Sequence, residues 1–127
     1  MKLNSISALT YYVQDLNKTI KFYEDIGMRA GKRDDVTAVF YVNWFSITFK
    51  QADKETDPEF IKEATSENKG LGQYLHIKVD NADEAYADAV SIGYKPSSQP
   101  RDWPWGNREF VMRDPDGYKL VFFQKLK

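Results

Sequence analysis

The chain has 127 residues and carries 18 Lys and Arg against 19 Asp and Glu, which gives a formal net charge of −1 at pH 7. This balance produces no overall field that would favour nucleic acid or an acidic membrane, so neither is expected as a partner. Cysteine is absent, which excludes disulfides, thiolate metal sites and thiol nucleophiles. The first residues contain no apolar run of the signal-peptide or membrane-span type, and a cytoplasmic protein is therefore expected.

The first predicted elements are a strand over 6–13 and a helix over about 16–26. Asp15 is the expected N-cap of this helix, because its carboxylate accepts from the free N–H groups of the first turn. Gly27 ends the helix, since glycine adopts the left-handed conformation without steric cost. Apolar residues recur at spacings of three and four along one helix face, at Leu16, Ile20, Tyr23 and Ile26.

After the helix the first half continues with three strands and a connector. The strands and the turn between the last two are predicted at 28–33, 37–42, Asn43-Trp44 and 45–51. Acidic residues outnumber lysines in the segment that follows, over 53–71, and Pro58 opens a short helix within it. We interpret this segment as a solvated acidic connector. A negative rim that attracts a cationic ligand is the alternative.

The second half repeats the first. Residues 79–93, VDNADEAYADAVSIG, match residues 13–27, VQDLNKTIKFYEDIG, because both begin with Val and end with Ile-Gly at the same spacing. The second helix is predicted over about 82–92, with Asn81 as its cap. The surrounding strands and the last turn are predicted at 73–79, 95–101, 108–113, the DPDG turn of 114–117, and 119–124.

The order strand–helix–three strands thus occurs twice, which indicates an α+β fold of two tandem βαβββ modules in a single domain, 1–127. Module one is placed at about 1–52, the acidic connector at 53–71, and module two at about 72–127.

The repeated unit, together with FYEDIG in the first helix and DPDG before the last strand, resembles the vicinal oxygen chelate superfamily, which includes glyoxalase I, extradiol dioxygenases and bleomycin-resistance proteins. The stretch QPRDWPWGNREFVMRDPDG, residues 99–117, resembles the bleomycin-resistance branch. The resemblance implies that the modules form a curved, partly open barrel with helices outside and a ligand cavity on the concave face. It also implies a homodimer.

Enzymes of the superfamily usually hold a divalent metal with four His or Glu side chains. The corresponding places in this chain are Ala8, Thr48, Tyr74 and Val121. None of these residues is a ligand for a catalytic divalent metal, and the only histidine, His76, lies two residues beyond the expected place. The resemblance therefore implies neither a metal nor a cofactor here, and no catalytic residue is assigned.

Alternation along the strands predicts what faces the cavity: aromatic rings, hydroxyls and one imidazole, which suit a flat, partly polar ligand. Trp103 and Trp105 flank a proline on a loop, and indole faces stack on planar heterocycles and attract cations. Arg108 and Glu109 alternate across a strand, so either is a rim charge or a salt-bridge partner. The candidate ligand-binding residues are Tyr12, Thr48, Tyr74, His76, Trp103, Trp105, Arg108 and Val121.

The sequence favours a metal-free small-molecule binding protein, of antibiotic-sequestering type, that holds a flat aromatic or cationic ligand in its concave cavity. One alternative is a metal-dependent glyoxalase-type lyase or extradiol-type dioxygenase with shifted ligands. Another is a dimeric interaction protein without a ligand. A cofactor-free enzyme with His76 as general base also stays open.

Overall fold

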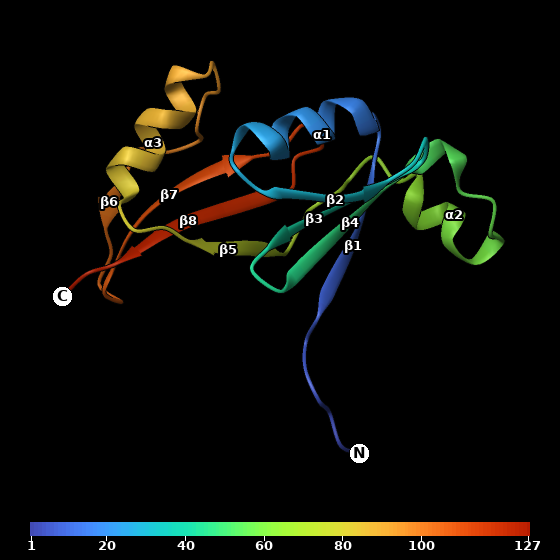
Figure 1. The fold of residues 1–127 in the computed structure, drawn as a ribbon, viewed down its shortest axis with the longest axis horizontal. Helices are drawn as coiled ribbons and strands as arrows, with labels where there is room; N and C mark the ends of the chain where they lie inside the picture. The colour runs from blue at the N-terminus through green and yellow to red at the C-terminus, as the bar shows by residue number, and fades with distance from the viewer. The chain divides into compact units, whose positions relative to one another are not determined.

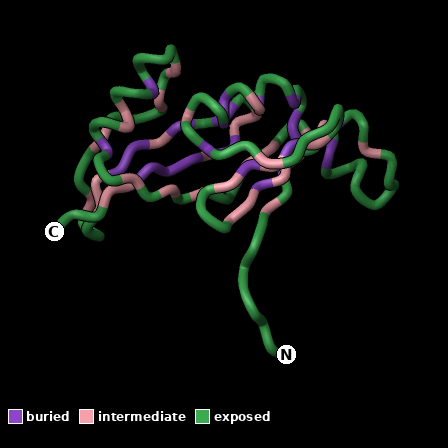
Figure 2. Tube along the Cα trace, viewed as in Figure 1, coloured by how far each residue is buried: buried purple, intermediate pink, exposed green.

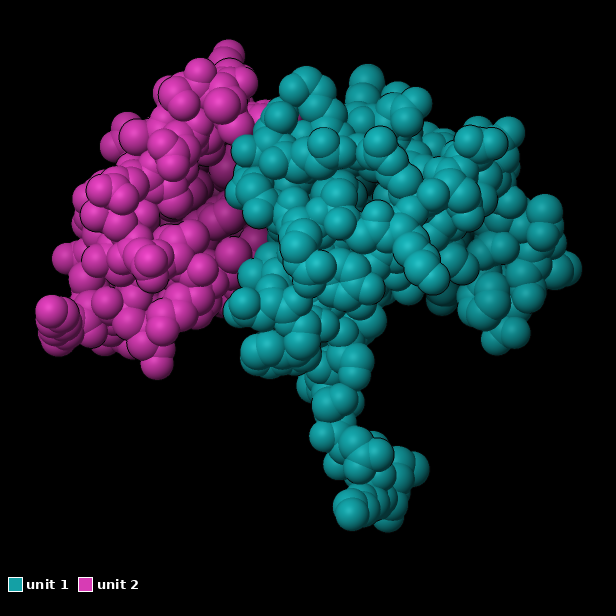
Figure 3. Space-filling model, in the orientation of Figure 1, with its two compact units in different colours: residues 1–67 teal, residues 68–127 magenta.

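The computed structural model describes residues 1–127, and the chain divides into two compact units, 1–67 and 68–127, which Figure 3 colours separately. The boundary falls within the segment that the sequence indicates as a connector.

Unit 1 contains one strand, one helix and three more strands, followed by two short helices (Figure 1). Its sheet has the order β1-β4-β3-β2, in which β1 runs parallel to β4 and the other neighbours are antiparallel. The short helix expected after Pro58 is present as α2. The elements are β1 (Ala8–Val13), α1 (Leu16–Asp25), β2 (Arg29–Arg33), β3 (Thr37–Val42), β4 (Phe45–Gln51), the 3₁₀ helix η1 (Ala52–Lys54) and α2 (Pro58–Ala64).

Unit 2 repeats this arrangement, with the sheet order β5-β8-β7-β6 and β5 parallel to β8. The predicted α+β fold of two tandem βαβββ modules is therefore confirmed. None of the helices of either unit has the length and apolar character needed to span a bilayer. The elements are β5 (Tyr74–Lys78), α3 (Ala82–Ser91), β6 (Arg101–Asp102), β7 (Asn107–Arg113) and β8 (Lys119–Lys125).

The predicted ends of both repeated helices are confirmed. The side chains of Asp15 and Asn81 each accept a hydrogen bond from the backbone N–H three residues on, at 3.2 and 3.1 Å. Gly27 and Gly93 follow the two helices with φ values of 97° and 101°, in the left-handed region where glycine carries no Cβ penalty. The repeated phrase thus places one equally bounded helix in each unit.

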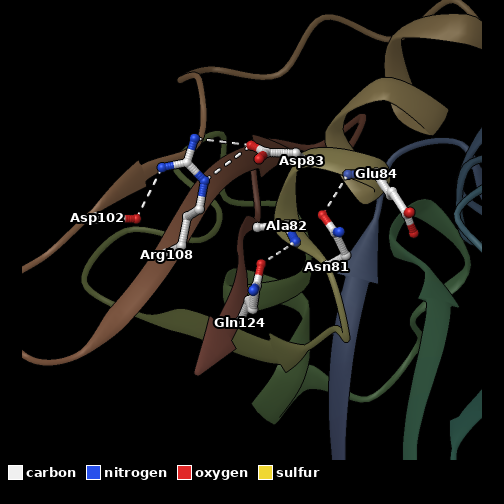
Figure 4. Close-up of polar contacts among 7 residues, drawn as sticks. All are labelled: Asn81, Ala82, Asp83, Glu84, Asp102, Arg108 and Gln124. Carbon is white, nitrogen blue, oxygen red and sulfur yellow. Dashed lines mark hydrogen bonds and ion pairs between the residues drawn. The ribbon is translucent and has the colours of Figure 1, made fainter. Parts of the chain in front are cut away.

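A glutamine at the end of the last strand satisfies the start of each helix. Gln51 Oε1 accepts from the backbone N–H of Leu16 at 2.8 Å, and Gln124 Oε1 accepts from that of Ala82 at 2.9 Å (Figure 4). These N–H groups belong to the first helical residues, which have no partner within their own helix. Each glutamine therefore ties the first turn of its helix to the parallel strand pair beside it.

Replacing this acceptor is expected to destabilise unit 2. In Gln124→Ala the N–H of the fully buried Ala82 loses its partner, so we expect the free energy of unfolding to fall by about 1 to 2 kcal/mol. Urea denaturation followed by circular dichroism measures this difference. Gln99→Ala, in an exposed loop, is the matched control and is expected to leave the free energy unchanged.

The core of unit 1 is made of aromatic rings between α1 and the sheet, and Figure 2 shows the buried stretches along the strands. The Phe49 ring lies 4.5 Å from that of Tyr23 and 6.0 Å from that of Phe40, measured between centroids. Tyr11 contacts the same phenylalanine at 5.9 Å. Phe49 is therefore the centre of this ring cluster.

The core of unit 2 has smaller helix side chains. Ala82 and Ala89 are the buried residues of α3, where α1 contributes Phe22 and Tyr23. The sheet contributes two phenylalanines, Phe110 and Phe122, whose rings stack with centroids 5.0 Å apart at 9°. Tyr86 meets the first of them edge-on at 5.5 Å.

One buried hydroxyl in unit 1 has no hydrogen-bond partner. Thr19 lies in α1 with 0% exposure, and its Oγ1 neither donates nor accepts. Thr19→Val keeps the β-branched shape and removes the unsatisfied group, so we expect it to raise the free energy of unfolding by about 1 kcal/mol. A melting curve of the variant beside wild type checks this. Thr65→Val removes a hydroxyl that does donate, to the carbonyl of Ile61, and is expected to destabilise instead.

The predicted strand over 95–101 is wrong. Only Arg101 and Asp102 form β6, and the preceding residues run beside β7 without a regular ladder. Pro96 and Pro100 have no N–H to donate, which interrupts a strand. The link that remains is made by two serines: Ser97 N–H donates to the Val111 carbonyl at 2.7 Å, and Ser98 Oγ accepts from the Val111 N–H at 3.0 Å.

Candidate functional site

In each unit the helix covers one face of the sheet and leaves the other face open. In unit 2 the register sets Tyr74 beside Lys119, His76 beside Val121, and Lys78 beside Phe123, all on the open face. Phe110 and Phe122 point to the opposite face, where Tyr86 of α3 packs. Three of the candidate ligand-binding residues, Tyr74, His76 and Val121, are therefore brought together on one surface.

The rings on this open face follow each other along and across the strands. The centroids of Tyr74 and His76 lie 6.4 Å apart, and those of His76 and Phe123 lie 6.3 Å apart. Lys119 Nζ lies 3.6 Å from the centroid of the Tyr74 ring, a cation–π contact. The surface thus combines aromatic area with two lysines, Lys119 beside Tyr74 and Lys78 beside Phe123.

The open face of unit 1 carries the other two strand candidates. Thr48 pairs with Thr10, and Tyr12 pairs with Lys50. At the far side of the sheet the Tyr41 ring crosses β2, where a Cβ at Gly31 would lie 2.6 Å from Tyr41 Cε2. A side chain at that position would therefore force the Tyr41 ring to shift.

Tyr12 lines a small hollow of about 130 Å³ at the end of this face, where it forms a hydrogen bond with Glu55 of the connector. Its hydroxyl donates to Glu55 Oε1, and Lys50 and Lys54 line the same hollow. The carboxylate accepts the phenol proton and opposes the charge of a phenolate, which together raise the pKa of Tyr12 to about 12. The same hydrogen bond lowers the pKa of Glu55.

The hydrogen bond between Tyr12 and Glu55 predicts how the Tyr12 hydroxyl titrates. Because the folded-state pKa of Tyr12 lies above the usual tyrosine value of 10.0, the stability that the contact adds is fully present below pH 10 and is lost as pH rises through about 12. Glu55→Gln removes the negative charge, so the pKa of Tyr12 is expected to fall towards 10.0. Ultraviolet titration of phenolate, with Tyr12→Phe subtracted to isolate this residue, measures the shift. Glu59→Gln, another carboxylate of the connector, serves as the control.

The tryptophan loop, residues 103–106 between β6 and β7, contains two indole rings that stack on each other. The rings of Trp103 and Trp105 stack with centroids 4.6 Å apart at 13°, and the guanidinium carbon of Arg101 lies 3.5 Å from the centroid of the Trp103 ring. Trp103 is thus enclosed between two groups, whereas Trp105 is 60% exposed. The outer face of one indole, that of Trp105, is available to a ligand.

Glu109 fixes this loop to the open face of unit 2. Its Oε2 accepts hydrogen bonds from Trp105 Nε1 and from Asn107 Nδ2, both at 3.0 Å. Glu109 pairs with Phe123 of β8, so the carboxylate lies in line with the aromatic surface described above. Glu109 is not among the ligand-binding residues predicted from the sequence. The signal for it was the alternation with Arg108, which puts the two side chains on opposite faces.

Arg108 lies on the helix side of the sheet and holds two carboxylates (Figure 4). Its Nε and Nη2 both lie 3.0 Å from Asp83 Oδ1 at the start of α3, and its Nη1 lies 3.0 Å from Asp102 Oδ1 of β6. Both carboxylates raise the pKa of Arg108. The salt-bridge interpretation of this residue is confirmed, and the structure places it away from the surface that carries Tyr74 and His76.

The residues at the family's metal positions do not fit a divalent ion. Of the four positions, Ala8 and Val121 have apolar side chains, and Thr48 and Tyr74 offer only neutral hydroxyls. His76, which lies beside Val121, adds a single imidazole. Catalytic zinc sites need three His, Cys or carboxylate ligands. No group of three or more His, Asp or Glu residues in the chain is arranged to hold a metal ion.

Two βαβββ units, each with a parallel first strand and an open sheet face opposite its helix, define a protein of the paired βαβββ class. Comparison with known proteins specifies the family. A model of the Glyoxalase/Bleomycin resistance protein/Dioxygenase superfamily matches residues 5–122, and the chain belongs to that superfamily.

Two known proteins and one solved structure are similar to this chain. The chain is 32% identical to a bleomycin resistance protein of Geobacillus stearothermophilus over 133 residues, which cover 98% of each chain. It is 28% identical to the "Probable lactoylglutathione lyase, chloroplastic" of Arabidopsis thaliana, over 92% of this chain but 35% of that one. A glyoxalase/bleomycin resistance protein/dioxygenase structure from Nocardioides has the same fold, with a TM-score of 0.77 at 22% identity, covering 100% of this chain and 87% of that one.

Proposed function

We propose that the protein binds and sequesters a planar small molecule, of antibiotic type, without a metal ion and without changing it. The observation that carries this proposal is the open face of unit 2, where the rings of Tyr74, His76 and Phe123 follow each other along the strands. At the Phe123 end of this row, Glu109 accepts from the indole N–H of the exposed Trp105. Ligand sites typically combine such aromatic area with a few fixed polar groups. The likeness to bleomycin resistance proteins over nearly the whole chain supports the sequestering role.

We further propose that the working form is a homodimer. β1 and β5 lie at the edges of their sheets, and unpaired strand edges favour association unless they are covered. The residues before β1 extend away from the unit 1 sheet, with Leu3 and Ile6 highly exposed (Figure 1). A second copy provides cover for both features. Size-exclusion chromatography with light scattering is expected to give twice the chain mass of 14.8 kDa, and a monomer at micromolar concentration would contradict it.

The binding proposal is tested by fluorescence and metal analysis together. Metal-free bleomycin and the neutral heterocycles quinoline and acridine are titrated into the purified protein, and quenching of tryptophan emission is expected to saturate for at least one of them. Elemental analysis of the same sample is expected to find no stoichiometric zinc, nickel or iron. If no probe causes saturable quenching, the binding function is wrong.

The rival reading, a metal-dependent lyase or dioxygenase, predicts the opposite metal result. It requires one tightly held ion per chain, and that ion must be lost in His76→Ala, since His76 is the only imidazole. Finding both would replace the sequestering proposal with a catalytic one.

A further inference from the structure

A buried carboxylate lies on the open face of unit 2 and takes part in no ion pair. Glu109 is only 8% exposed, and it is one of three buried polar or charged side chains in the chain. Its neighbours in register are Phe123 of β8 and Arg101 of β6. Burying an ionised carboxylate costs desolvation free energy unless the group is paired. The groups that surround Glu109 therefore decide which partner it is able to bind.

The partners of this carboxylate are neutral. Oε2 accepts from the indole N–H of Trp105 and the amide of Asn107, each at 3.0 Å, and these two bonds fix the plane of the group. Glu109 takes part in none of the ion pairs of the chain. Oε1 accepts no hydrogen bond from another side chain, and it is not sealed from solvent. One oxygen is therefore held in place and the other is open to a donor.

The nearest candidate counter-charge is turned away. Arg101 faces Glu109 across the β6–β7 pair, yet its guanidinium carbon lies 3.5 Å from the centre of the Trp103 ring. A cross-strand pair of opposite charges ordinarily forms an ion pair. Here the guanidinium of Arg101 stacks on the Trp103 ring, and the carboxylate of Glu109 has no ion-pair partner within the chain.

We propose that Glu109 is a subsite for the positively charged group of a planar organic cation whose ring lies against the outer face of Trp105. The proposal rests on the binding function above and narrows its ligand class. The charged group pairs with Oε1, and the rings of Trp105 and Phe123 add cation–π attraction beside it. A neutral planar molecule contacts the rings of Trp105 and Phe123 but forms no ion pair with Glu109.

Other charges lie along the same face. Arg113 and Lys119 pair with each other at the far end of β7 and β8, four residues or roughly 13 Å of strand from Glu109. Lys78 lies in the same row as Glu109, since both pair with Phe123. Cations therefore stand at both ends of the face, and the direct contact of the ligand with Oε1 carries the selectivity.

The test compares two probes of nearly equal shape, 1-methylquinolinium, which is a cation, and quinoline, which is neutral near pH 7. Binding is followed by the indole N–H signals in ¹⁵N–¹H spectra of the full chain. Wild type is expected to bind the cation about tenfold more tightly, equivalent to about 1.4 kcal/mol. Glu109→Gln retains an oxygen that accepts from Trp105 and Asn107 but removes the charge, so it is expected to lose the tenfold preference for the cation over quinoline. Glu84→Gln, an exposed acid of α3, makes the same charge change and is expected to keep the preference.

The outcomes separate this proposal from the one it rests on. Equal affinity of wild type for the two probes, or a preference that persists in Glu109→Gln, overturns the cation subsite and leaves small-molecule binding intact. Binding of neither probe removes both proposals. If Glu109→Gln does not fold, nuclear Overhauser contacts in wild type decide: contacts of the N-methyl group to Trp105 and Phe123 support the subsite, and contacts to Tyr74 and Lys119 overturn it.

Discussion

Phe49→Ala is expected to lower the free energy of unfolding by about 3 to 5 kcal/mol, the range for removing a buried phenylalanine ring. The ring has 0% exposure and contacts Tyr11, Tyr23 and Phe40 at the centre of the unit 1 core. Its removal leaves a cavity that three other rings cannot collapse into without leaving their rotamers. Since domains of this size are stable by only about 5 to 15 kcal/mol, a large fraction of the variant is expected to be unfolded at physiological temperature.

Urea denaturation of Phe49→Ala beside wild type measures the loss. Phe49→Leu is the graded control, because it fills part of the cavity and is expected to cost less. Trp44→Ala removes an even larger aromatic side chain, but from an exposed turn, and it is expected to change the free energy by less than about 0.5 kcal/mol. If Trp44→Ala costs as much as Phe49→Ala, the ring cluster is not the core of unit 1.

The fold was predictable where the signal is local. Asp15 and Asn81 cap the start of their helices, which needs only a short polar side chain at a fixed offset. Gly27 and Gly93 end the same helices, which needs only a residue that adopts a positive φ. The repetition of these offsets showed the two modules. The error at 95–101 is also instructive, since Pro96 and Pro100 signalled a broken ladder in the sequence itself.

The candidate site was less predictable because its key contacts depend on distant residues. Alternation correctly placed Tyr74 and His76 on the face opposite α3. No local rule indicates that Trp103 is covered by Arg101, or that Glu109 receives the indole N–H of Trp105. Those contacts depend on the side-chain rotamers of Arg101, Trp105 and Glu109, which the sequence does not show.

Trp105→Ala is expected to weaken binding of a planar ligand about thirtyfold, which corresponds to about 2 kcal/mol, the typical contribution of a dominant aromatic contact. The outer face of Trp105 is the exposed indole surface beside the sheet, whereas Trp103 is enclosed between Arg101 and Trp105. Quinoline binding, followed by the remaining indole signals, measures the loss.

The two tryptophans give a matched comparison within one loop. Trp103→Phe keeps a ring beneath Trp105 and is expected to weaken quinoline binding less than threefold. Trp105→Phe keeps a smaller ring but loses the hydrogen bond to Glu109, so it is expected to fall between Trp105→Ala and wild type. An equal loss in Trp103→Phe and Trp105→Ala would mean that the loop acts through its overall shape. The larger loss in Trp105→Ala would instead establish that the outer indole face itself holds the ligand, with Glu109 fixing its orientation.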